Sequence, residues 1–311
     1  MISPVKQFSG KSNDSLEYVA EAIVQEKGMR MVGTDILTLR PFFRRYEKKS
    51  KIQTLKPVVS LLEGMKCMGK CLGIHPAFME EYSDYDLLID RIKSNPFDRN
   101  SVVLGPLSKK VMWERVDSLF YDNQSYFITI VERAKNGFYV HDPEGTPYLE
   151  LDVEELRKNI EAIPVPKLLI HMGKIEKKQI SMDEVWCAFL EELKTRIKDV
   201  RDDKCAGADG LTLLYGDIGE KIRSSEKMRL YYNFIDIQKA NQSIKEGFVW
   251  NQMTVVSETM KHQISEKLDQ YNLVIGSLLV ELIQEDIQKI KKNLLTCAEI
   301  EEGMLELYSM L

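Results

Sequence analysis

Apolar residues in the early part of the chain recur every three or four positions, which is the spacing of one face of a helix. Residues 14–27 carry several apolar residues at this spacing and end before Gly28, a residue type that commonly follows the last helical turn. Asp14 or Ser15 can serve as the N-cap, because either side chain accepts a hydrogen bond from a free N–H group of the first turn. We therefore predict a helix over 14–27.

Two further helices are predicted in the same part of the chain. One covers 57–72, where Pro57 suits the first turn because its missing N–H group would have no partner there. The other covers 82–94 and ends at Asn95-Pro96, because a proline disfavours helical geometry in the residue before it.

The pattern then changes to short runs rich in β-branched and aromatic residues, which are typical of strands: 101–104, 126–131, 138–141 and 167–171. The first run ends at Gly105-Pro106. The dipeptide Asn136-Gly137 lies between the second and third runs and predicts a β-hairpin, because this pair readily adopts the backbone angles of a tight turn. A helix of about ten residues is predicted from Val153.

The distribution of proline divides the chain. All 10 prolines lie between Pro4 and Pro166, and proline interrupts helices because it lacks an N–H group and its ring clashes with the preceding turn. The remainder is therefore free to be helical. We predict an α+β domain over 1–170 and an all-helical domain over 171–311.

Three helical segments are expected in this second half. The sequence Ser181-Met182-Asp183-Glu184 is a capping box, in which the serine and glutamate side chains each bind a free N–H group. A buried stripe follows at intervals of four residues: Val185, Phe189, Leu193 and Ile197. The stretches 223–246 and 250–293 are also expected to be helical, the latter with one or two breaks.

Composition narrows the class of protein. The 43 basic and 48 acidic side chains give a formal charge of -5, which argues against a general nucleic-acid-binding protein. Five cysteines, an odd number, favour a reducing compartment. Because no apolar run reaches the roughly 18 residues that a membrane span requires, we expect a soluble cytoplasmic protein without a membrane-embedded part.

Two sequence patterns resemble cofactor-binding sites, but a structural role, burial in the core or the start of a helix, explains each of them better. Cys67, Cys71 and His75 are spaced four apart and could hold a soft metal from one helix face, yet cysteine is among the most buried residue types. The glycine-rich segment 207–219 lacks the spacing and the preceding strand of a dinucleotide-binding loop, so it is interpreted as a hinge or a helix start. We predict no metal and no cofactor.

Two segments carry a resemblance to a known family: SVVLGPL at 101–107 and QSYFITIVERAKNGFYVHDPEGTPYLELDVEELRKNI at 124–160. They resemble the second half of the papain-like domain of the butirosin-biosynthesis acyltransferase (BtrH-like) family and, more distantly, the bacteriocin-processing cysteine peptidases. The resemblance implies a papain-like, cysteine-peptidase-like α+β domain followed by an all-helical C-terminal domain. The segment GADGLTLLYGDIGEKI at 207–222 is similar to the start of that second domain.

Enzymes of this family pass an acyl group from a carrier-protein thioester to an amine by means of a Cys-His-Asp triad. Carried over to this sequence, the resemblance implies Ser15 at the nucleophile position (thirteen residues before Gly28), Tyr126 at the base position and Asp142 as orienter. The implied substrate cleft would be lined by Asp14, Gly105, Pro106 and His141.

Two of the three implied triad positions carry a residue other than the family's Cys or His, and both differences are expected to lower catalytic activity. A neutral tyrosine has a pKa near 10 and accepts protons poorly at pH 7, and a serine without a base is a weak nucleophile. We therefore expect a pseudoenzyme of antibiotic biosynthesis that binds its substrate, with acyl transfer as the reaction if the site is active. The implied partners are an acyl- or peptidyl-carrier protein, a homologous enzyme or a small-molecule amine, and self-association remains open.

The sequence is compatible with two other classes of function. In one, the chain is a non-enzymatic interaction or scaffold protein that partners an active homologue through its helical half. In the other, Cys67, Cys71 and His75 form the metal centre of a metal-dependent enzyme.

Overall fold

The computed structural model describes ten segments of the chain: residues 34–49, 54–73, 79–96, 102–108, 125–141, 149–163, 165–171, 180–223, 226–250 and 253–311. They form a mixed α+β structure, as the sequence predicts at this coarse level. The predicted helix over 14–27 lies outside the described residues.

The described residues group into two compact units. One unit, here called the sheet unit, spans Leu72–Gln179, and the other, the helical unit, combines Met31–Cys71 with Ile180–Leu311. This grouping differs from a single division near residue 170, because an early segment of the chain packs with the late helices.

The sheet unit contains a six-stranded sheet in the order β3-β8-β4-β5-β6-β7, in which every neighbouring pair is antiparallel. Its strands are β3 Met79–Tyr82, β4 Val102–Ser108, β5 Ser125–Arg133, β6 Gly137–His141, β7 Leu149–Asp152 and β8 Lys167–His171. The hairpin predicted at Asn136-Gly137 is confirmed: it joins β5 to β6, and the N–H of Ala134 donates to the carbonyl of Gly137.

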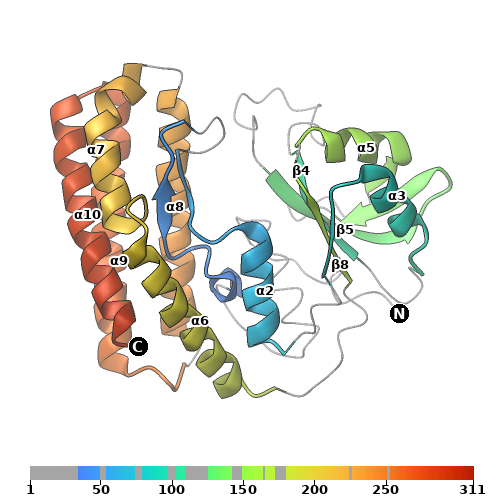
Figure 1. The fold of residues 1–311 in the computed structure, drawn as a ribbon, viewed down its shortest axis with the longest axis horizontal. Helices are drawn as coiled ribbons and strands as arrows, with labels where there is room; N and C mark the ends of the chain where they lie inside the picture. The colour runs from blue at the N-terminus through green and yellow to red at the C-terminus, as the bar shows by residue number, and fades with distance from the viewer. Residues whose placement is uncertain are drawn as a thin grey trace. The chain divides into compact units, whose positions relative to one another are not determined.

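Two helices, α3 Tyr85–Lys93 and α5 Val153–Glu161, pack on the sheet (Figure 1). Leu88 and Ile92 of α3 and Leu156 and Ile160 of α5 are fully buried against strand residues such as Leu104, and burial of such apolar area is the main source of folding free energy. Asp84 caps α3, and Asp152 forms a capping box with Glu155 at the start of α5, so both helices begin where a side chain can accept from the first free N–H groups.

Strand β4 does not end at Gly105-Pro106, as the sequence predicted, but continues through it to Ser108. The pairing of β4 with β5 shifts between Leu104 and Leu107, so the proline lies at an irregularity where no ladder hydrogen bond is required of it. A β-carbon at position 105 would overlap the ring of Phe127, which explains the glycine there.

The helical unit is built from one 3-10 helix, a two-stranded hairpin and longer α-helices: η2 Thr34–Thr38, β1 Arg44–Tyr46, β2 Leu55–Pro57, α2 Leu61–Cys71, α6 Met182–Asp202, α7 Gly207–Arg223, α8 Glu226–Trp250, α9 Glu258–Gln284 and α10 Ile287–Ser309. Pro57 ends β2 instead of starting a helix, so that part of the prediction was wrong. The helix starts after Ser60, whose hydroxyl accepts from the N–H of Glu63.

The core of the helical unit contains a cluster of aromatic rings contributed by the early segment and by the late helices. Phe42 contacts Phe189 of α6, Phe248 of α8 and Tyr308 of α10, with ring centroids 5.7, 6.2 and 5.1 Å away. Tilted and edge-to-face pairs at such distances stabilise a core beyond the apolar area that they bury. The early segment is therefore part of this core.

The capping box at Ser181 and Glu184 is confirmed, and so is the buried stripe that follows it on α6. The predicted stretch 250–293 is interrupted, as expected: α9 ends at Gln284, the next residue, Glu285, adopts a left-handed backbone with φ of 60°, and Asp286 caps α10. Among the described helices, none combines the length and the apolar character needed to cross a membrane.

Candidate functional site

The positions implied by the family resemblance are only partly described. Asp14, Ser15 and Asp142 lie outside the described residues. Tyr126 and His141 lie in strands whose backbone is described, but their side chains are not. Gly105 and Pro106 are described in full, and both are buried.

The register of the sheet brings four of these positions onto three adjacent strands. Tyr126 of β5 pairs with Leu107 of β4, the residue after Pro106. His141 of β6 pairs with Thr129, three residues further along β5. Paired residues in neighbouring strands lie about 5 Å apart and three residues of strand span roughly 10 Å, so Pro106, Tyr126 and His141 lie on three adjacent strands, with Tyr126 and His141 offset by three residues along the sheet.

Thr129 marks the same region by an unsatisfied polar atom. Its side chain is fully buried, and its hydroxyl oxygen has no hydrogen-bond partner among the residues that the structure describes. Buried hydroxyl groups are paired in most proteins, because leaving one unpaired costs about 1–3 kcal/mol. Sequence reasoning had no signal for this residue, since a threonine in a strand is ordinary.

A second polar cluster, not anticipated from the sequence, lies on β3, β8 and α3. Glu80 accepts two hydrogen bonds from the guanidinium of Arg91, at 2.9 and 3.2 Å, and one from the hydroxyl of Tyr82 at 3.2 Å. Nε2 of His171 lies 2.8 Å from the same carboxylate. The imidazole is almost fully buried, with 6% of the side chain exposed.

The charge of this cluster fixes the proton on His171. Burial by itself would raise the pKa of Glu80, but the hydrogen bonds from Arg91 and His171 and their charges lower it to about 2. Because the carboxylate is ionised at neutral pH, Nε2 of His171 is the donor in this contact. The cluster also joins α3 to the edge of the sheet.

The position of His171 in the sheet separates it from Tyr126. His171 pairs with Val102 at the start of β4, whereas Tyr126 pairs with Leu107 near its end. Five residues of strand span roughly 15 Å, so His171 does not lie next to Tyr126. Only its place at the end of an apolar run could have drawn attention to it.

Lys167, four residues before His171, is completely buried. Its ammonium group donates to the main-chain carbonyls of Ile163 and Val165, the latter at 2.7 Å, and lies 5.4 Å from the centre of the Tyr85 ring. Desolvation lowers the pKa of Lys167 to about 8. The lysine binds carbonyls just beyond the end of α5, where a positive charge is favourable.

The cysteines of the metal alternative lie in α2 of the helical unit, and both are buried. Desolvation raises the pKa of both thiols, to about 12 for Cys71, which disfavours the thiolate form that binds metals. His75 lies outside the described residues. Within the described part of the chain, no group of three or more His, Cys, Asp or Glu side chains is arranged to hold a metal ion.

The glycine-rich segment is a helix start, as the sequence indicated. Gly207 begins α7 with a positive φ of 53°, and the preceding element is the helix α6, not a strand. The segment therefore lacks the strand–loop–helix geometry with which phosphate loops bind nucleotides.

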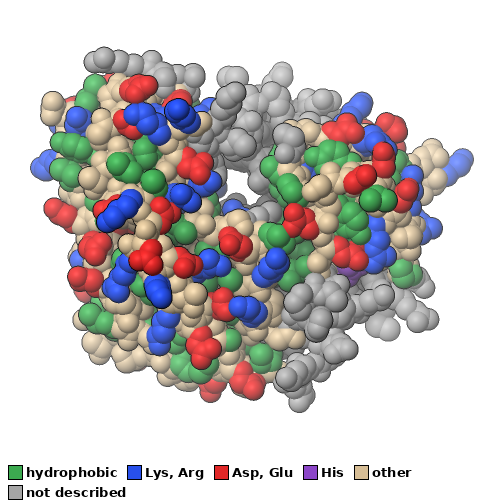
Figure 2. Space-filling model, viewed as in Figure 1, with side chains coloured by type: hydrophobic (Ala, Val, Ile, Leu, Met, Phe, Trp, Pro, Cys, Tyr) green, Lys and Arg blue, Asp and Glu red, His purple; other side chains and the backbone are tan. Residues whose placement is uncertain are grey.

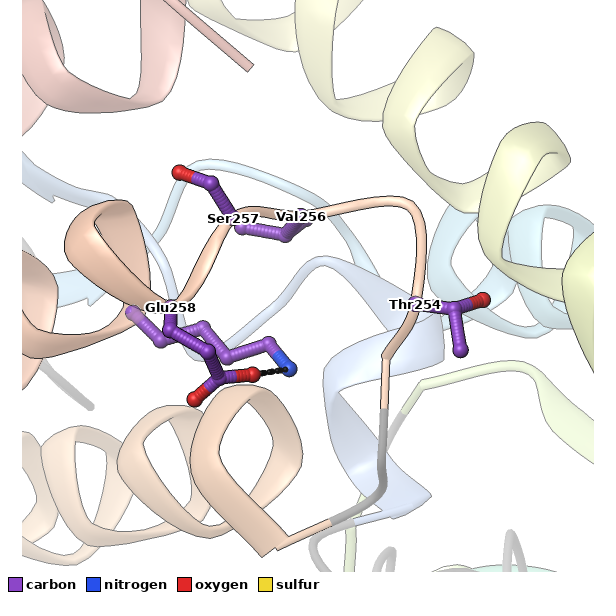
Figure 3. A pocket seen from close by; sticks show the side chains of 5 residues that line it. Thr254, Val256, Ser257 and Glu258 are labelled. Carbon is purple, nitrogen blue, oxygen red and sulfur yellow. Dashed lines mark hydrogen bonds and ion pairs between the residues drawn. The ribbon is translucent and has the colours of Figure 1, made fainter.

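A shallow pocket of about 360 Å³ lies in the helical unit at the start of α9 (Figure 3). It is lined by Thr254, Val256, Ser257, Glu258 and Lys261. Lys261 is buried, and its ammonium group is bound to Glu258 at 2.7 Å, while the hydroxyl of Ser257 caps the helix. Thr254 donates to Asp183 of α6, so each polar side chain that lines this pocket already has a hydrogen-bond partner.

No model of a known protein family matches the chain, and no curated protein matches it.

Proposed function

We propose that the chain is a BtrH-like pseudoenzyme that binds an acyl- or peptidyl-carrier-linked substrate at the papain-like site without turning it over. The observation that supports this proposal most is the strand register, in which the Gly105-Pro106 irregularity, Tyr126 and His141 occupy adjacent strands. Gly105 and His141, which lie 36 residues apart in the sequence, are thus on strands of the same sheet, on either side of the strand that carries Tyr126.

The proposal of binding without turnover rests on the chemistry of the base position. Tyr126 stands where the family has histidine, and a phenol with a pKa near 10 accepts a proton poorly at neutral pH. His171 of β8 is bound to Glu80 and pairs with Val102, at the opposite end of β4 from the partner of Tyr126. Loss of base and nucleophile from a triad lowers rates by factors on the order of 10⁴–10⁶.

The test uses acyl thioesters of carrier proteins and intact-mass measurement of the full chain. The wild-type chain is expected to bind loaded carrier protein and to form no covalent acyl adduct. The double variant Ser15→Cys, Tyr126→His is expected to form the adduct, because it restores nucleophile and base beside Asp142. The single variant Ser15→Cys is the matched control, since it supplies a thiol without the imidazole.

Two outcomes would contradict the proposal. A wild-type adduct that disappears in Ser15→Ala would show that the chain is an active acyltransferase. If the chain does not bind loaded carrier protein and the double variant forms no adduct, the family assignment itself fails.

A second function, that of a scaffold for a catalytically complete homologue, is favoured by one feature of the helical unit. Leu273, Val280 and Ile283 of α9 are exposed at 74%, 52% and 63% of their surface. On the face drawn in Figure 2, apolar side chains of this unit lie scattered among acidic and basic ones. Co-purification with a homologue should be lost in Leu273→Lys and retained in the control Lys292→Glu, if α9 makes the contact.

A further inference from the structure

The helices α8 and α9 lie side by side in the helical unit and run antiparallel to each other. Lys245 binds Asp269 at 2.7 Å near one end of the pair, and Lys227 binds Glu285 at 2.5 Å near the other end. Between these two ion pairs, both helices expose apolar side chains to solvent.

We call this surface the α8–α9 face. Leu273, Val280 and Ile283 of α9 and Met228 of α8 are exposed large apolar residues of the face. Ile235 lies two helical turns along α8 from Met228, on the same side of the helix, and is partly exposed. Single exposed apolar residues are common on protein surfaces, whereas a contiguous group of them indicates an interaction site.

The distribution of charge indicates that the partner is a protein. The segment 270–280 of α9 and the segment 230–235 of α8 contain no charged residue, although charged residues make up 29% of the chain. At the rim, the carboxylates of Asp269 and Glu285 are each bound by a lysine of α8. An apolar centre depleted of charge inside a polar rim is typical of protein–protein interfaces.

The spacing of the positions on α9 favours a second copy of this chain as that protein. Four positions are separated by three, four and three residues, so that the row has the same spacing in both directions: Leu273, Gly276, Val280 and Ile283. An antiparallel second α9, related by a two-fold axis at the midpoint, places Leu273 against Ile283 of the second copy and Gly276 against its Val280. In a two-fold contact, residue i meets residue j and residue j meets residue i, as this row allows.

Gly276 leaves space for the valine of the second copy. A β-carbon at position 276 would have one neighbour within 4 Å, Nε2 of Gln238 at 3.9 Å. The small residue therefore forms a recess in the face, and Val280 forms the matching projection. Large and small residues that alternate across an interface let its two sides interdigitate.

We propose that the α8–α9 face joins two copies of the chain in an antiparallel, two-fold symmetric dimer. The face extends from residue 269 to residue 285 of α9, roughly 24 Å at about 1.5 Å per residue, and two helices are about 20 Å wide. It therefore covers about 500 Å² per copy and about 1,000 Å² in the dimer, the lower limit for a specific interface. The dimer is thus a reversible one, with a dissociation constant of roughly 1–100 µM.

The experiment is sedimentation equilibrium of the full chain over roughly 1–300 µM, which brackets the expected dissociation constant. Wild type is expected to change from monomer to dimer and to form no larger species, because a two-fold contact is closed. Val280→Lys should raise the dissociation constant about 100-fold, since the lost apolar contact occurs twice in the dimer. Leu295→Lys is the matched control: Leu295 is also an exposed apolar residue, but it lies on α10, outside the face.

The antiparallel register is tested by charge compensation. Leu273→Lys and Ile283→Glu should each weaken the dimer when introduced alone. The double variant Leu273→Lys, Ile283→Glu should associate more tightly than either single variant and lose this gain at high salt, because each new ammonium group then faces a carboxylate of the second copy. A parallel dimer would place like charges opposite each other and would not recover.

Four results would overturn the proposal. The chain stays monomeric over the whole concentration range, Leu295→Lys weakens the dimer as much as Val280→Lys does, the double variant associates no better than the single variants, or the face binds only a homologous protein. All of these substitutions are at exposed positions of the helical unit, so thermal melting and carrier-protein binding should match wild type. The dimer and the proposed function can therefore fail independently.

Discussion

Replacing Lys167 with methionine tests whether a buried ammonium group limits the stability of the sheet unit. The lysine side chain has no exposed surface, and its two hydrogen-bond acceptors are main-chain carbonyls of Ile163 and Val165. Methionine has a similar length and no charge. The substitution therefore removes the cost of desolvating the cation and also removes the donor for two carbonyl groups.

The magnitude follows from the pKa of Lys167, which desolvation lowers to about 8 from a usual value near 10.5. Below pH 8 both the folded and the unfolded chain carry the proton. As the pH rises from about 8 to about 10.5, the unfolded chain holds more protons than the folded one, so the free energy of unfolding increases by roughly 3 kcal/mol. Leaving two carbonyls unpaired in Lys167→Met costs about 1–3 kcal/mol each at every pH.

The assay is urea-dependent hydrogen exchange of the full chain, read on peptides from β4 and β8, at several values between pH 7 and pH 10.5. Wild type should gain stability over this range relative to Lys167→Met, while the two should be closer near pH 7. Lys158→Met, at an exposed position on α5, is the control and should follow wild type. Parallel pH profiles for wild type and Lys167→Met would refute the reasoning.

Two further predictions concern stability. Glu80→Gln should lower the free energy of unfolding by about 1–2 kcal/mol at pH 7, after allowance for the partial exposure of Glu80. The pKa of Glu80 is about 2, so this stability is lost as the pH falls from about 4.5 to 2, and melting curves of variant and wild type should converge there. Gly216→Ala, in open space on α7, should raise stability by roughly 0.5–1 kcal/mol in urea unfolding. Gly137→Ala should lower it, because a β-carbon there would overlap the backbone of Leu151. A loss of stability in Gly216→Ala, or a gain in Gly137→Ala, would contradict the packing described here.

Local signals in the sequence predicted several elements well. The capping box at Ser181, the turn at Asn136-Gly137 and the run 167–171 each depend on interactions between near neighbours, and each is found as an element. The short strands β1, β2, β3 and β7 were missed. Such strands are three or four residues long, and they owe their pairing to distant partners more than to their own pattern.

The candidate site residues also fall into two groups, those that local sequence signals predict and those that depend on contacts between distant residues. The strands that carry Tyr126 and His141 follow from alternation and turn chemistry, so their register could be anticipated. The cluster of Glu80, Arg91 and His171 could not, because 91 positions separate the glutamate from the histidine and no motif links them.

The early segment that supplies Phe42 has a consequence for biogenesis. The helical unit is interrupted in sequence by the sheet unit, so the chain leaves it after Cys71 and returns at Ile180. During synthesis on the ribosome, residues 34–71 emerge long before the helices that bury their aromatic rings. Their aromatic rings therefore stay exposed to solvent until the late helices have been synthesised, although the intervening strands can already fold. A chaperone would be most useful during this interval, because exposed apolar surface promotes aggregation.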